Sequence, residues 1–178
     1  CGRFDRPITL NVDSSTSMDC IGTCIHHIFA IYDEDVSVEE NLERATKVCD
    51  GYGMKEVIPM VEQVNRSISI LYQHLREQYG EAVSIKHEIP FVRQLEGQIM
   101  KGEMDLVWFL DERSCVLVDF KNFPGSEKDV LNPENSHYAG NYAAQLFAYR
   151  ETLKEAGYHV LDTLVYYSVI GRVVRFKF

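Results

Sequence analysis

Apolar residues recur every three or four positions through the first half of the chain, which is the spacing of amphipathic helices. Ser37 and Glu40 have the spacing of a capping box, and Gly80 follows the longest run as a stop signal. The pattern therefore predicts three helices: one from the serines at 14–17 to about Tyr32, one from Ser37 to just before Gly51, and one from about Lys55 to Tyr79.

From Ala82 onward the pattern changes to short runs rich in β-branched and aromatic residues. We expect an antiparallel meander of three strands at 83–92, 99–110 and 115–121, with Pro90 marking an edge strand or a bend. A long loop at 122–136, a helix at 137–156, and two strands at 160–170 and 173–178 should follow. These elements predict an α/β domain whose central mixed sheet is flanked by helices on both faces.

Length and composition agree with one domain over residues 1–178, because 178 residues with 46% hydrophobic content can bury a sizeable core. The chain starts at Cys1, and we expect it to be a piece of a longer polypeptide. Five cysteines without zinc-site spacing favour a reducing, cytoplasmic setting. We find no apolar run of the roughly 20 residues that a membrane span requires, so no membrane partner is expected. A net charge of −9 argues against a domain that attracts nucleic acid by charge alone.

Asp119, Phe120 and Lys121 end an apolar strand and carry the strongest chemical signal. Residues two apart on a strand share a face, so the carboxylate and the ammonium should lie side by side. If Asp105 reaches the same place, two carboxylates could hold Mg²⁺ near a phosphate, with Lys121 as the cation beside it.

The turn between the second and third strands decides whether Asp105 can do so. A four-residue turn at 111–114 would set Asp105 opposite Phe120 and on the wrong face. We therefore predict a bulge, or a turn of three or five residues, between positions 103 and 121.

Two helices should bring further polar groups to this strand. His26 lies at the margin of the apolar stripe of the first helix, whereas His27 should face solvent. On the late helix, four residues at helical spacing align their polar tips: Tyr138, Tyr142, Gln145 and Tyr149. Packing alone explains Tyr138 and Tyr142.

Four motifs in this order resemble the RecB-like nuclease family of the PD-(D/E)xK superfamily: Gly22-Thr23-Cys24-Ile25-His26, Gly102-Glu103-Met104-Asp105, Asp119-Phe120-Lys121 and Gln145-Leu146-Phe147-Ala148-Tyr149. The chain looks most similar to the nuclease domain that ends AddA-type and RecB-type helicase-nucleases. The resemblance covers roughly residues 14–170 and implies a restriction-endonuclease-like core.

The resemblance also implies a metal-dependent DNase. Mg²⁺ or Mn²⁺, as one or two ions, would be held by His26, Asp105, Asp119 and the backbone carbonyl of Phe120. Lys121 would position or activate the attacking water, and Gln145 and Tyr149 would support the lysine and the DNA strand. Glu88 stands where such domains often carry a glutamate, and Asn122 replaces a more usual Thr or Ser. No iron-sulfur cluster is expected, because no cysteine follows Cys115.

Single-stranded DNA ends delivered by a helicase motor domain are the expected substrate, which would place the protein in DNA end processing and repair. Two alternatives stay open. The chain could be a stand-alone Cas4-like or restriction-type nuclease, or a module of the same fold that binds DNA or assembles complexes without hydrolysis.

Overall fold

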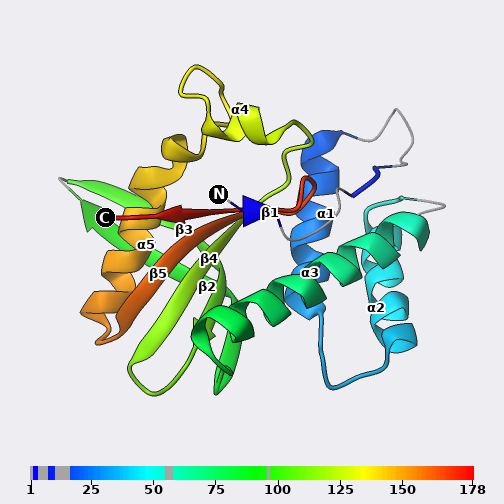
Figure 1. The fold of residues 1–178 in the computed structure, drawn as a ribbon, viewed down its shortest axis with the longest axis horizontal. Coiled ribbons are helices and arrows are strands. Elements are labelled where there is room, and N and C mark those ends of the chain that lie inside the picture. Colours follow the sequence, from blue (N-terminus) through cyan, green and yellow to red (C-terminus); the bar gives the residue numbers. More distant parts are fainter. Residues whose placement is uncertain (1, 4–7, 11–16, 55–57, 96) are drawn as a thin grey trace.

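The computed structural model describes residues 2–3, 8–10, 17–54, 58–95 and 97–178. Six strands form one mixed sheet in the order β1-β6-β5-β4-β3-β2 (Figure 1). β4 and β5 are parallel and the other neighbours are antiparallel. The strands are β1 (Gly2–Arg3), β2 (Ser84–Leu95), β3 (Gln98–Phe109), β4 (Ser114–Lys121), β5 (His159–Tyr167) and β6 (Arg172–Phe176).

Helices cover both faces of this sheet. One apolar core lies between the sheet and three helices, α1 (Met18–Ile31), α2 (Val38–Gly51) and α3 (Ile58–Tyr79). The second core lies against α4 (Glu127–Leu131) and α5 (Ala143–Glu155), which follows a 3₁₀ turn, η1 (Ala139–Tyr142). Figure 1 shows α5 and α1–α3 on opposite sides of the strands. The predicted α/β class with a mixed, helix-flanked sheet is confirmed.

The predicted starts of the first two helices are confirmed by their caps. Ser17 accepts a hydrogen bond from the Cys20 N–H at 3.2 Å, and Ser37 accepts one from the Glu40 N–H at 3.1 Å. The candidate caps at 14–16 and the predicted start of the third helix at Lys55 lie outside the described residues.

The segment between β4 and β5 differs from the prediction in two places. The expected loop at 122–136 contains α4, whose start is capped by Ser126 and Asp129. The late helix begins at Ala143 rather than at position 137, because Gly140 and Asn141 are poor helix formers and lie in the 3₁₀ turn. Tyr138 therefore stands outside the helix that was expected to carry it.

The β3–β4 turn confirms the prediction of an odd spacing. Phe109 pairs with Cys115, so the five residues 110–114 separate the last paired positions. The same register pairs Leu106 with Val118, and one further step sets Asp105 across from Asp119. Asp105 and Asp119 therefore lie at the same level along the two strands.

No described helix has the length and apolar character needed to cross a membrane.

Candidate metal centre

All the predicted site residues line one cleft of about 830 Å³ between α1, the hairpin strands and the start of α5. The cleft gathers residues that are far apart in the sequence: His26, Glu88, Asp105, Asp119, Phe120, Lys121, Gln145 and Tyr149. Five carboxylate side chains line it, on Asp19, Glu88, Glu103, Asp105 and Asp119, against a single lysine, Lys121. The cleft is therefore strongly acidic when it holds no cation.

An irregularity in the β2–β3 ladder creates the floor of this cleft. His87 pairs with Leu106 and Ile89 pairs with Met104, but Glu88 and Asp105 between them form no ladder pair. Glu88 has φ +50°, the only positive value on a non-glycine among the described residues. Such a backbone costs a non-glycine residue roughly 1–3 kcal/mol and is found most often where a side chain must be aimed.

Strand β3 changes the direction of its side chains at the same point. Leu106 and Trp108 belong to the core under α1–α3, whereas Met104 belongs to the core under α5. Residues two apart would share a face in a regular strand. Because of this reversal, Asp105 faces α1 together with Leu106, and its carboxylate reaches His26.

Side chains from three elements, α1, β2 and β3, come together next to this irregularity. Ligand atoms of His26, Glu88 and Asp105 all lie within 4.8 Å of one another. The His26 Nδ1 atom is 3.6 Å from Asp105 Oδ1, while Asp105 Oδ2 accepts a hydrogen bond from the Phe120 N–H at 2.5 Å. The contact with Phe120 fixes the orientation of the Asp105 carboxylate.

Asp119 and Lys121 form the second part of the site. Lys121 Nζ lies 2.7 Å from Asp119 Oδ2 and 4.6 Å from the centre of the Tyr142 ring. Asp119 is only 1% exposed, and among the described residues its Oδ2 has no hydrogen-bond partner apart from the contact with Lys121. Asp119 is not a member of the group of three that includes His26, so it stands beside that group.

Burial and mutual repulsion raise the pKa values of two acids in the cleft, Asp119 and Glu88. Burial raises the pKa of Asp119 to about 6, helped by the negative charge of Asp105 and offset only in part by Lys121. Burial, the charge of Asp105 and a contact with Glu103 raise the pKa of Glu88 to about 7. For His26, burial lowers the pKa, but contact with Asp105 and the charge of Glu88 outweigh it, so its pKa stands above the ordinary value.

These features fit a divalent cation. Among the described residues, the buried oxygen Glu88 Oε1 has no hydrogen-bond partner, and Asp119 Oδ2 has only the ion pair with Lys121. Unpaired buried oxygens are rare unless an ion or water uses them. Carboxylate oxygens with one imidazole suit Mg²⁺ or Mn²⁺, and a dication would relieve the repulsion that raises both pKa values.

Gln145 and Tyr149 line the opposite wall. Gln145 Nε2 donates a hydrogen bond to Tyr149 Oη at 2.5 Å. The Tyr149 ring packs edge-on against Phe91, with centroids 4.7 Å apart. Gly102 makes room for both, since a Cβ there would lie 2.9 Å from the Phe91 ring and 3.3 Å from Tyr149 Oη. The absence of a side chain at Gly102 therefore leaves room for the ring of Tyr149.

The side chain of Asn122 connects the end of β4 to α1 and to the segment after β5. Its Nδ2 donates to the Gly22 carbonyl at 2.9 Å, and its Oδ1 accepts a short hydrogen bond from Ser168. Asn122, which stands where the resemblance predicts Thr or Ser, thus has two partners.

Sequence reasoning left three neighbours of the site without a firm role. Glu88 belongs to the group of three candidate ligands and has a left-handed backbone, which no residue pattern signals. Tyr142 was assigned to packing but lies under the ammonium of Lys121. Ser168 carried no signal, because its partner Asn122 is 46 positions away.

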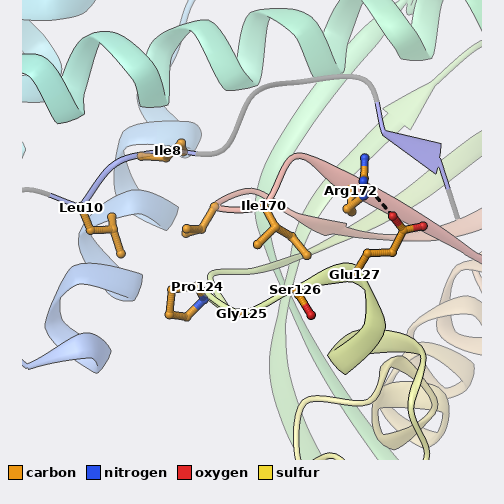
Figure 2. A pocket seen from close by; sticks show the side chains of 9 residues that line it. Ile8, Leu10, Pro124, Gly125, Ser126, Glu127, Ile170 and Arg172 are labelled. Atoms are coloured by element: carbon orange, nitrogen blue, oxygen red, sulfur yellow. Dashed lines mark ion pairs between the residues drawn. The ribbon is translucent and has the colours of Figure 1, made fainter.

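A smaller cavity of about 290 Å³ adjoins the cleft at Pro124, which lines both (Figure 2). Its walls are largely apolar, with Ile8, Leu10 and Ile170 facing it, and Arg172 pairs with Glu127 at 2.7 Å on its edge. None of the five carboxylates that line the cleft lines this cavity.

No family model matches the chain, and a comparison with curated proteins gives no match. Among solved structures, the chain is similar to protein VC1899 from Vibrio cholerae, with 8% identity and a TM-score of 0.32 over 83% of this chain and 42% of that one. It is also similar to SSO0001, with 15% identity and a TM-score of 0.33 over 86% of this chain and 74% of that one. The chain spans less than half of the VC1899 chain, and TM-scores of this size do not establish a shared fold.

Proposed function

We propose that this chain is a metal-dependent deoxyribonuclease domain that hydrolyses phosphodiester bonds. The observation that carries the proposal is the meeting of His26, Glu88 and Asp105 within 4.8 Å, in the same cleft as the Asp119–Lys121 pair. An oxygen-rich cation site beside a lysine is the arrangement that phosphoryl transfer needs, because charge develops on the phosphate oxygens during the reaction.

His26, Glu88 and Asp105, with Asp119 beside them, would hold Mg²⁺ or Mn²⁺. Glu88 is an addition to the ligand set expected from the resemblance, which named His26, Asp105, Asp119 and the Phe120 carbonyl. A bound divalent cation supplies Lewis acidity and lowers the pKa of water, which makes attack on a phosphodiester possible near neutral pH.

The remaining polar groups act on the substrate. Lys121, held by Asp119 and by the Tyr142 ring, would place its positive charge against a phosphate oxygen and stabilise the charge that develops there. Gln145 donates into the Tyr149 oxygen, which leaves the Tyr149 hydroxyl hydrogen free for the DNA backbone. Asp105 orients His26 and is itself held by Phe120.

The acidic cleft also bears on the substrate. Five carboxylates and one lysine would repel a polyanion, so DNA binding by this domain should depend on bound cations. We propose that a helicase motor of the same chain or complex delivers single-stranded DNA ends, which removes the need for a basic surface here. Membership of the RecB-like nucleases, with their restriction-endonuclease-like core, is part of the same proposal.

The test is degradation of DNA by the purified protein with Mg²⁺, with Mn²⁺ and with EDTA. Variants Asp119→Ala, Lys121→Ala and His26→Ala should lose cleavage while their far-ultraviolet circular dichroism stays that of the wild type. Glu62→Gln, on the exposed face of α3 away from the cleft, is the matched control and should cleave normally. Undiminished cleavage by Asp119→Ala would refute the proposal, and a wild type that binds Mn²⁺ and DNA without cleaving would favour a non-catalytic module.

A further inference from the structure

A stacked pair of rings stands at the cleft wall beyond Lys121. The rings of Phe123 and His137 lie nearly parallel, with centroids 4.0 Å apart and an angle of 17° between their planes. Both residues line the cleft that holds the acidic cluster. Phe123 is half-buried against the core under α5, whereas His137 is exposed. One ring is thus anchored and the other presents itself to the cleft.

The backbone holds this pair in place before any ligand binds. The His137 N–H donates to Asn135 Oδ1 at 2.9 Å, and the His137 carbonyl accepts from Tyr167 Oη at 3.2 Å. An exposed ring would ordinarily sample several positions, but here both backbone groups of its residue are bound. These bonds fix the backbone of His137, and the stack with Phe123 restricts its ring, so less freedom is lost when a ligand stacks on it.

Gly125 shows that the position of Phe123 depends on a missing side chain. A Cβ at Gly125 would lie 2.0 Å from Phe123 Cζ and 2.2 Å from Cε1, so the ring occupies the space over this glycine. Any other residue at position 125 would push the ring away. Gly125 thus controls the position of the stack, and the same Cβ would also lie 3.0 Å from Asp129 Oδ2, which is not part of the cleft lining.

We propose that Phe123 and His137 form a stacking platform for one base of single-stranded DNA. This inference rests on the proposed nuclease function and specifies how the substrate is recognised. Aromatic rings bind bases through their faces regardless of sequence. In a duplex, neighbouring pairs already cover those faces, so the platform selects unpaired nucleotides. Phe123 follows Lys121 by two residues, so the ammonium and the platform would take a phosphate and a base of the same strand.

The test measures whether the His137 ring and one base of the DNA contact each other. The full chain is titrated with fluorescent oligonucleotides in Ca²⁺, each carrying one abasic site at a different position. At one position the wild type should lose affinity by about 5- to 100-fold, the range for one stacked base. His137→Ala should lose a similar factor with intact DNA and should be indifferent to the abasic site at that position, because the two changes remove the same contact.

A further variant tests whether the position of the Phe123 ring matters, in addition to the presence of the His137 ring, and two control variants accompany it. Gly125→Ala should reproduce the loss, since it displaces Phe123, whereas Gly51→Ala should not, because a Cβ there meets nothing within 4 Å. His159→Ala, at an exposed histidine outside the cleft lining, is the second control.

Equal sensitivity to the abasic site in the wild type and in His137→Ala would overturn the platform, and so would equal affinity for blunt duplex and single strands. Cleavage in Mn²⁺ is measured on the same samples. If the protein cleaves DNA but the effects of His137→Ala and of the abasic site are independent, only the stacking platform is refuted. If there is no metal-dependent cleavage, the proposed function is refuted.

Discussion

The carboxylate of Asp105 takes the place of a strand neighbour for Phe120, because its Oδ2 accepts the Phe120 N–H at 2.5 Å where regular β3–β4 pairing has ended at Leu106. The same carboxylate directs its other oxygen toward His26. Asp105 thus has a structural bond on one side and a candidate ligand atom on the other.

Two substitutions of Asp105 should therefore separate stability from metal binding. Asp105→Ala leaves the buried Phe120 N–H without an acceptor and should lower the free energy of unfolding by about 1–3 kcal/mol. Asp105→Asn can still accept that bond through its amide oxygen and should unfold close to the wild type. Both should lose Mn²⁺ binding in calorimetric titration. Equal stability of the two variants in urea would show that the bond to Phe120 contributes nothing.

Because Glu88 has a left-handed backbone, replacing it should raise the stability of the metal-free protein and lower its affinity for Mn²⁺. Glu88→Gly removes both the strain and a poorly solvated carboxyl, so the metal-free protein should become more stable by about 1 kcal/mol while its Mn²⁺ affinity falls. Glu88→Gln keeps the strain and should lose affinity with a smaller gain in stability. Lys101→Gly, at an exposed position of β3 with ordinary backbone, should instead destabilise the protein. A destabilised Glu88→Gly variant would mean that the strain is absent in solution.

The raised pKa values predict how stability varies with pH. The pKa of Glu88 is about 7 and that of Asp119 about 6, against ordinary values of 4.5 and 3.8. Groups with raised pKa values favour folding most at low pH, below the unfolded-state values, and this contribution is lost as the pH rises through 6 and 7. Thermal melts without metal should therefore show this part of the stability falling between pH 4 and pH 8.

Mn²⁺ should reverse that loss, because it binds the ionised carboxylates and competes with their protons. The increase in melting temperature on adding Mn²⁺ should be small at pH 5 and should grow through pH 6–7. Asp119→Asn should melt higher than the wild type at pH 8 without metal and gain less from Mn²⁺. An Mn²⁺ effect that is the same at pH 5 and pH 8 would contradict the assignment of these acids as ligands.

Lys121 should matter for chemistry rather than for metal binding. Lys121→Met keeps the length of the side chain and removes the charge, so cleavage should fall by about 100- to 1,000-fold, the usual effect of losing one charge-stabilising group. Mn²⁺ affinity should stay equal or rise, since a competing cation has gone. Lys47→Met, on the exposed surface of α2, serves as the control. Loss of Mn²⁺ binding in Lys121→Met would show that the lysine supports the site structurally.

The sequence predicts those parts of the fold that depend on local pattern or on counting. The caps at Ser17 and Ser37 and the meander follow from spacing, since each is set by residues close in the chain. The odd β3–β4 turn follows instead from the chemistry expected of the site. The strand limits alone give a four-residue turn with Asp105 on the wrong face, and only an odd turn or a bulge brings Asp105 beside Asp119. The roles of these residues in catalysis stay predictions until the variants are measured.

Features that depend on backbone exceptions or on distant loops could not be predicted in this way. Glu88 looks like an ordinary strand residue, and no residue pattern signals its positive φ. Phe123 and His137 are separated by α4, which was expected to be loop, so nothing local indicates that their rings stack. The late start of α5 follows from Gly140, whose low helix propensity outweighed the spacing of the tyrosines.

The amide of Asn122 spans three segments of the chain, bonding Gly22 in α1 and Ser168 after β5 from its own place next to Lys121. The helix that carries the imidazole and the strand that carries the ammonium are therefore fastened to each other by one small side chain. Their spacing is established when the chain folds, so the candidate metal site does not have to assemble when a ligand arrives.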